Sequence, residues 1–194
     1  MQVTLLTAAD AVQYRALMLQ AYELAADAFT TTREEREAEP ASFWLKRIAD
    51  PAGLSAAFGA FDDGRLLGTV ALEFSRKPKT CHKGLVIGMY VAPQARGRGA
   101  GQALMRALIG HAESRPGLRT LVLTVTAGNQ PALELYRSFG FETFGTEPMA
   151  ILTPDGFKAK VHMWRALTPS VCIQLAGAAA PGPGDAKAGV PRLG

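Results

Sequence analysis

Residues 85–102 constrain the fold of this 194-residue chain more than any other segment. The apolar run at 85–91 has the character of a strand, and a short turn then leads into Arg96-Gly97-Arg98-Gly99-Ala100-Gly101-Gln102. Apolar residues next recur at helical spacing up to about residue 114, where Pro116-Gly117 ends the pattern. The segment therefore predicts a strand, a glycine-rich loop and an amphipathic helix.

A glycine-rich loop at the start of a helix is suited to binding a phosphate. The first N–H groups of a helix have no intrahelical acceptor, the helix dipole favours negative charge there, and glycines allow close approach of the main chain. The loop lacks the Gly-Lys-Ser/Thr of a P-loop, and the spacing of Gly97, Gly99 and Gly101 differs from the dinucleotide-binding fingerprint. Both nucleotide motifs are excluded.

A second strand and helix follow. Residues 120–126 alternate in the way of a half-buried strand, and Asn129-Gln130-Pro131 begins a short helix. Gly140 ends this helix, and Phe141 can fold back over its end, which predicts a Schellman-type stop.

Together the two units resemble the GNAT superfamily of acyl-CoA-dependent N-acetyltransferases. Residues 96–101 match its Arg/Gln-x-x-Gly-x-Gly/Ala signature, and residues 129–141 resemble its second motif, in the order that the family has. The resemblance covers most of residues 1–167. It implies an α/β (α+β) fold, in which a mixed, mostly antiparallel sheet is flanked by helices and the acyl-CoA cradle lies at a strand–loop–helix turn.

The rest of the chain fits this order of elements. Ahead of residue 85 the pattern predicts two helices, the first with a capping box from Thr7 to Asp10, and then a hairpin that turns at residues 62–64. Two further strands are expected around Phe144 and Val161.

We expect one GNAT domain over residues 1–167 and a flexible Ala/Gly/Pro-rich tail over 168–194. The tail has few large apolar side chains to offset the entropy of ordering it. Its short apolar run at 171–175 could instead pair with a sheet edge or with a neighbouring subunit.

Composition narrows the range of binding partners that we expect. No apolar run approaches the ~20 residues of a membrane span, and no basic segment precedes an apolar one, so we expect a cytoplasmic protein without membrane contact. Two cysteines and three scattered histidines predict no metal site. The modest net charge of +4 suits a polyphosphate cosubstrate better than a nucleic acid. A monomer or a homodimer that binds acetyl-CoA and an amine acceptor is expected.

The resemblance assigns residues to acetyl-CoA. In the family, a bulge in the strand before the loop pairs with the pantetheine arm, which implies this role for Met89, Tyr90 and Val91. The pyrophosphate is expected at the loop, and the implied contacts are Arg96, Gly97, Arg98, Gly99, Ala100, Gly101 and Gln102. Asn129 either contacts the cofactor amides or caps its own helix, and both roles are compatible.

Tyr136 matches the acid tyrosine of the family. A phenol with a pKa near ~10 keeps its proton at neutral pH and can donate it to a thiolate leaving group. Packing in the core is the alternative role for Tyr136. Glu73 is the first candidate for the general base, followed by Glu142 and His162, although Glu73 could be an ordinary exposed side chain and water could remove the amine proton.

The sequence does not identify the acceptor. Residues 30–39 contain four glutamates, which could attract a cationic amine or could belong to a solvated helix start. A small amine, an amino acid, an antibiotic-like amine and a peptide N-terminus all fit. The expected function is transfer of an acetyl group from acetyl-CoA to a primary amine by direct attack in a ternary complex. The alternative is a non-catalytic acyl-CoA-binding sensor or regulatory module.

Overall fold

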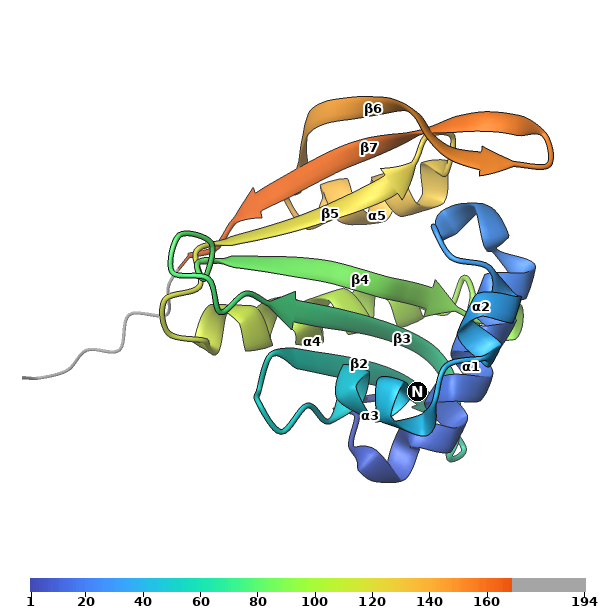
Figure 1. Cartoon of the computed structure of the whole chain (residues 1–194). Helices are drawn as coiled ribbons and strands as arrows, with labels where there is room; N and C mark the ends of the chain where they lie inside the picture. Colours follow the sequence, from blue (N-terminus) through green and yellow to red (C-terminus); the bar gives the residue numbers. More distant parts are fainter. Residues whose placement is uncertain (169–194) are drawn as a thin grey trace, which may run out of the picture.

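The computed structural model describes residues 1–168 as one seven-stranded sheet with helices on both faces (Figure 1). The predicted tail lies outside the described residues, apart from Thr168 at its start. The strands are β1 (Gln2–Leu5), β2 (Ser55–Asp62), β3 (Arg65–Phe74), β4 (Lys83–Val91), β5 (Thr120–Thr126), β6 (Glu142–Thr153) and β7 (Gly156–Ala166). The α-helices are α1 (Ala11–Leu24), α2 (Arg33–Glu37), α3 (Ala41–Ile48), α4 (Ala100–Ser114) and α5 (Gln130–Ser138), and the short 3-10 helices are η1 (Ala8–Asp10), η2 (Ala26–Ala28) and η3 (Pro93–Ala95).

The strand order is β1-β2-β3-β4-β5-β7-β6. Among the described residues, β4 and β5 form the parallel pair, and the other neighbouring strands are antiparallel. This arrangement confirms the expected mixed, mostly antiparallel sheet.

Local sequence signals predicted several element ends correctly. The N–H of Phe141 donates to the carbonyl of Tyr136 at 3.1 Å, the N–H of Gly140 donates to that of Arg137 at 2.9 Å, and Gly140 has a φ of 76°. These are the bonds of a Schellman motif. The predicted capping box at Thr7 is also present, where the Asp10 carboxylate accepts from the Thr7 N–H at 2.8 Å.

One strand was not predicted, and the glutamate-rich segment forms a separate short helix. β1 has only four residues, most of them exposed, so it shows no clear alternation of apolar and polar side chains. It forms because the edge of β2 offers a partner, with Leu5 opposite Phe58. The short helix α2 lies within the glutamate-rich segment and begins with a capping box at Thr32.

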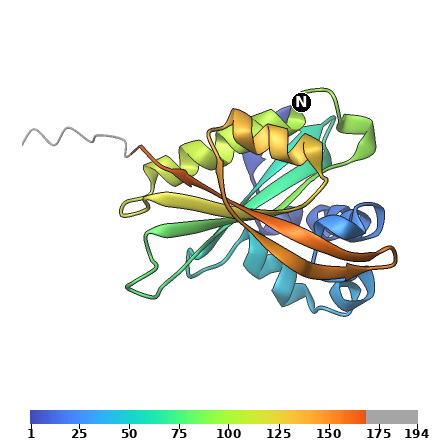
Figure 2. The same cartoon turned by 90° about the horizontal axis from the view of Figure 1, so that it is seen from above.

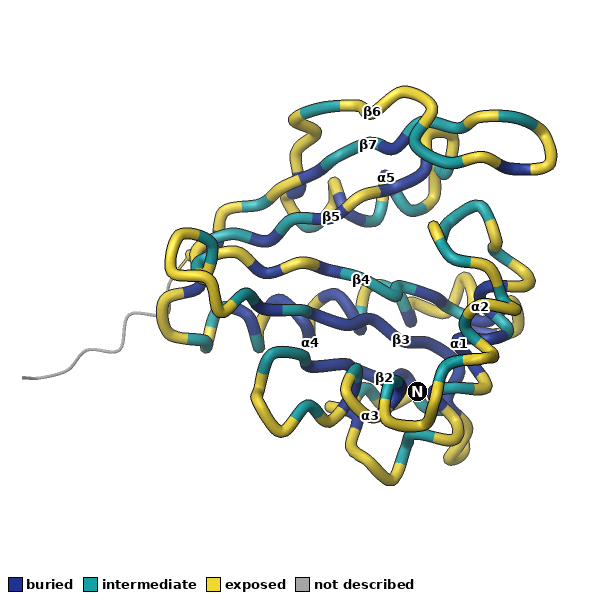
Figure 3. Tube along the Cα trace, viewed as in Figure 1, coloured by how far each residue is buried: buried dark blue, intermediate teal, exposed yellow. Residues whose placement is uncertain are grey.

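Each face of the sheet carries its own apolar layer. α4 and α5 pack on one face, and α1 and α3 pack on the other (Figure 2). β3 is buried along most of its length (Figure 3). Val70 and Leu72 belong to the apolar layer that contains α4, and Ala71 belongs to the layer that contains α1. Because β3 is covered on both sides, the middle of the sheet is a fixed frame for the strands beside it.

β4 and β5 separate after a short stretch of pairing. Their register covers Lys83–Leu85 of β4 opposite Thr120–Val122 of β5, and the two strands then diverge toward their C-terminal ends (Figure 1). In β4, one extra residue opposite β3 forms a bulge at residues 88–89, where Gly88 has a φ of 60°. The bulge expected in this strand is therefore present, and it lies where the sheet opens.

Gly140 and Gly110 form a matched pair for testing the helix-end argument. We expect Gly140→Ala to lower the free energy of unfolding by about 1 kcal/mol, because alanine is strained at a positive φ. Gly110→Ala, in the exposed interior of α4 with open space around it, is expected to raise that free energy by up to about 1 kcal/mol. Urea unfolding of both variants measures the difference. Equal effects of the two substitutions would contradict the role given to Gly140.

Candidate functional site

A groove of about 780 Å³ lies between the end of β4, the start of α4 and the helix α5. We call it the glycine-loop groove. All the residues that the sequence assigned to cofactor contacts line it, with the exception of Arg98: they are Met89, Tyr90, Val91, Arg96, Gly97, Gly99, Ala100, Gly101, Gln102 and Asn129. Leu24, Ala25 and Ala28, at the end of α1 and in η2, complete the wall and were not predicted.

The loop at the head of α4 has the backbone of an anion site. Gly97 and Gly99 have φ values of 70° and 77°, which side chains other than glycine rarely adopt. The N–H of Ala103 makes the first bond of the helix, to the carbonyl of Gly99 at 3.0 Å. The N–H groups of residues 100–102 come before this bond and are therefore available to an anion in the groove.

The two arginines of the loop have different positions. Nε of Arg96 donates to the carbonyl of Val91 at 3.0 Å and so ties the loop to the end of β4. The Arg98 guanidinium pairs with Asp62 at 2.9 Å, at the β2–β3 turn, and it does not line the groove. Its positive charge is thus partly compensated within the protein.

A second cavity, of about 230 Å³, occupies the opening between the two diverging strands. We call it the β4–β5 cavity. Residues 86–89 of β4 and 124–126 of β5 form its sides, and Tyr136 of α5 also lines it. The groove and the cavity share four lining residues: Ala28, Met89, Asn129 and Ala132. The two spaces therefore meet beside the β4 bulge.

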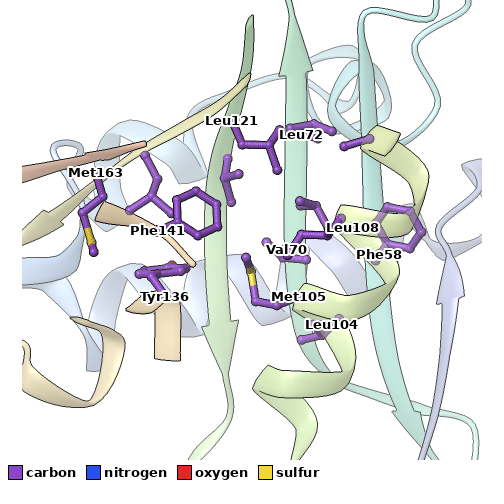
Figure 4. Close-up of a cluster of buried hydrophobic side chains, with 14 of the residues drawn as sticks. Phe58, Val70, Leu72, Leu104, Met105, Leu108, Leu121, Tyr136, Phe141 and Met163 are labelled. Atoms are coloured by element: carbon purple, nitrogen blue, oxygen red, sulfur yellow. The ribbon is translucent and has the colours of Figure 1, made fainter. Parts of the chain in front are cut away.

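Tyr136 belongs both to the core and to the cavity. Its ring is buried and stands edge-on to Phe141, with 5.9 Å between the ring centroids, inside the layer under α4 and α5 (Figure 4). Burial raises the pKa of the Tyr136 phenol above its usual value. The side chain is thus held in one place and stays protonated at neutral pH.

Asn129 caps α5, because its Oδ1 accepts from the N–H of Ala132 at 3.3 Å. It also lines both the groove and the cavity. The two roles that the sequence suggested for Asn129 are therefore compatible in the folded chain.

The candidate bases lie elsewhere. Glu73 is on β3 near Arg47, with 3.6 Å between carboxylate and guanidinium, and it lines neither the groove nor the β4–β5 cavity. Glu142 is exposed at the start of β6, and Nε2 of His162 lies 3.2 Å from the Glu147 carboxylate on the β6–β7 hairpin. The structure does not bring any of these three candidates together with Tyr136.

Three cationic side chains of the cavity were missed: Arg36, Arg47 and Lys160. Lys160 is only 4% exposed, and its Nζ donates to Thr126 Oγ1 at 2.9 Å and to the carbonyl of Ala28 at 3.1 Å. Burial lowers the pKa of its ammonium group. A lysine on a β-strand is an ordinary surface residue in sequence terms, so no local signal marked this one.

The comparison with known families agrees with the geometry. The model of the acetyltransferase (GNAT) family matches residues 18–141, which span both motifs and the divergence of β4 from β5. The chain belongs to the GNAT family. This membership and the observed sheet confirm the fold that the resemblance implied.

Individual relatives are similar to this chain over part of their length. This GNAT chain is 30% identical over 103 residues to the L-amino acid N-acetyltransferase AaaT of Escherichia coli, covering 53% of this chain and 62% of that protein. It is 38% identical over 122 residues to the mycothiol acetyltransferase of Rhodococcus jostii, covering 60% of this chain and 37% of that protein. The chain thus matches less than two thirds of the length of either relative.

Solved structures match over a longer span. A GCN5-related N-acetyltransferase from Kribbella flavida is 30% identical, with a TM-score of 0.70 over 86% of this chain and 97% of that one. The Salmonella typhimurium protein yncA, solved with its cofactor acetyl-CoA, is 19% identical, with a TM-score of 0.72 over 89% of this chain and 99% of that one. The second likeness concerns the fold alone.

Membrane-spanning helices and metal-binding clusters of side chains are both absent from residues 1–168. No helix in this range has the length and apolar character needed to cross a membrane. The same residues contain no group of three or more histidine, cysteine, aspartate or glutamate side chains arranged to hold a metal ion.

Proposed function

We propose that this protein is an N-acetyltransferase that moves an acetyl group from acetyl-CoA to a primary amine by direct attack in a ternary complex. The observation that carries the proposal is the meeting of the glycine-loop groove and the β4–β5 cavity at four shared residues. A long cosubstrate in the groove and an acceptor in the cavity would reach the same place from different sides. A non-catalytic acyl-CoA sensor needs no such second cavity.

The groove suits acetyl-CoA. The free N–H groups at residues 100–102 fit its pyrophosphate. Beyond Leu85, no strand within residues 1–168 pairs with the edge of β4 that faces β5, so the backbone groups at residues 89–91 are open to the amides of a pantetheine arm. When bound, acetyl-CoA supplies an activated acetyl group.

Tyr136 is proposed as the general acid that protonates the departing thiolate. Burial raises the pKa of its phenol, so the proton is present at neutral pH and can be donated as negative charge develops on the sulfur of the breaking C–S bond. The packing of the ring against Phe141 fixes the direction of the hydroxyl group. Among the described residues, no carboxylate or imidazole lines the cavity, so we assign removal of the amine proton to water rather than to Glu73.

Gly101 tests the proposed cosubstrate site. A Cβ at this position would lie 3.3 Å from side-chain atoms of both Leu135 and Met89, at the edge of the groove. We expect Gly101→Glu to weaken acetyl-CoA binding by at least about a hundredfold, because it adds bulk and negative charge where the pyrophosphate binds. Gly110→Glu, on the same helix but in open space, is the control and should bind normally. Calorimetry on both folded variants gives the affinities, and normal binding by Gly101→Glu would refute the assignment.

Tyr136→Phe tests the proposed acid. The substitution keeps the ring that packs on Phe141 and removes only the hydroxyl group. We expect turnover to fall by about 10²-fold or more, with the affinity for acetyl-CoA nearly unchanged. Thiol release measured at saturating substrates gives the rate, and single-turnover kinetics show whether chemistry limits it. An unchanged rate with chemistry limiting would leave Tyr136 a core residue only.

A further inference from the structure

The walls of the β4–β5 cavity carry positive charge. Lys160, Arg36 and Arg47 line it together with threonines and apolar side chains, and no aspartate or glutamate is among the described lining residues. The four glutamates at 30–39, which could have attracted a cationic amine, do not line it. Such walls attract an anionic group and repel an acceptor whose charge is only positive.

The three cations differ in how far nearby carboxylates of the protein already compensate their positive charge. Arg36 pairs with Glu39 at 3.4 Å, and Arg47 lies 3.6 Å from Glu73. Lys160 forms no ion pair with any residue in the described range, and Lys158, two residues before it, takes the Asp27 carboxylate. An ammonium group has three N–H donors, of which Lys160 uses two on Thr126 and Ala28. The third N–H of Lys160 has no acceptor within residues 1–168.

A buried cation without a carboxylate partner lowers the stability of the folded state. Transfer of the Lys160 ammonium out of water costs free energy that its two neutral hydrogen-bond acceptors do not fully return. Asp27 and Glu147 lie near enough to act on its charge, but neither forms an ion pair with it. An anion that enters the cavity would complete this site.

We propose that the acceptor is a small amine that also carries a carboxylate, the class to which free α-amino acids belong, and that Lys160 binds this carboxylate. The inference rests on the N-acetyltransferase function proposed above. A cavity of about 230 Å³ lies below the ~300–1,000 Å³ of typical ligand pockets, so what enters it is no larger than a small molecule such as an amino acid.

The positions of Lys160 and Tyr136 fit the two ends of such a molecule. Thr126 and Lys160 are paired neighbours on β5 and β7, and both bond to η2, on the face of the sheet that carries α1. Tyr136 comes from α5, on the opposite face (Figure 2). A carboxylate held by Lys160 would leave the amine of the same molecule to point through the strand opening toward Tyr136.

The same positive walls favour the reactive form of the acceptor. Nearby cations lower the pKa of an amine, because they disfavour its protonated form. A bound amino acid would therefore lose its amine proton more readily in the cavity than in water. This effect accounts for a site that works without a carboxylate base.

Binding and turnover are tested separately. Calorimetry uses the full chain saturated with coenzyme A, which has no acetyl group to transfer, and measures the affinities of the twenty proteinogenic L-amino acids and of their primary amides. Thiol release from acetyl-CoA is then followed with the same compounds. We expect at least one free acid to bind and to react about tenfold to a hundredfold better than its own amide, the range for a hydrogen bond to a charged group.

Lys160→Met removes the ammonium and keeps the length of the side chain. We expect the KM of the preferred acid to rise about tenfold to a hundredfold, the KM of its amide to change little, and the acetyl-CoA affinity to persist. Lys83→Met is the control, because Lys83 is exposed at the start of β4 and does not line the cavity. If Lys160→Met fails to fold, the comparison of acid with amide on the unmodified protein still tests the carboxylate site, and the same comparison on Lys160→Gln tests the part played by Lys160.

The outcomes separate the two proposals. Acids that bind better than their amides without releasing thiol would support the carboxylate site and refute the transferase function. Thiol release that is as fast with amides as with free acids would refute the carboxylate site and support the transferase function. If the unmodified protein and folded Lys160→Met prefer the acid over its amide to the same extent, Lys160 does not bind the carboxylate.

Discussion

The end of hydrogen bonding between β4 and β5 is the constraint on which the site depends. The two strands pair only from Lys83 to Leu85 of β4, and the bulge at Gly88 turns the rest of β4 along a different course. Backbone groups freed in this way need other partners, since unpaired N–H and C=O groups are costly when buried. The groove, the cavity and the position of Tyr136 all follow from the opening of a sheet whose other strands remain paired.

The elements predicted well from sequence are those fixed by neighbouring residues. Helix ends at Thr7, Asn129 and Gly140 depend on bonds that reach at most five residues along the chain. The glycine loop has the same local character, because positive φ at Gly97 and Gly99 and the free N–H groups behind them are properties of one turn. Cofactor contacts on this loop could therefore be proposed before the fold was known.

The features that were missed depend on contacts between distant parts of the chain. Arg98 was expected at a phosphate, but its partner Asp62 comes from the β2–β3 hairpin. Lys160 reaches the cavity because β7 pairs with β5 and because its ammonium meets the carbonyl of Ala28, 132 residues earlier. A strand lysine and a short turn give no sign of each other in the sequence, so the charge of the cavity emerges only from the assembled fold.

The opening between the strands is closed at both ends, and the two closures differ in strength. At the narrow end, β4 and β5 join through backbone pairing; at the wide end, the side chains of Thr126, Lys158 and Lys160 hold the three-residue turn η2. The opening is thus bounded at one end by backbone pairing and at the other end by side-chain contacts to η2. Side-chain contacts to a short turn open at lower free energy than a paired sheet does. Local opening is therefore expected to cost less free energy at η2 than at the paired ends of β4 and β5.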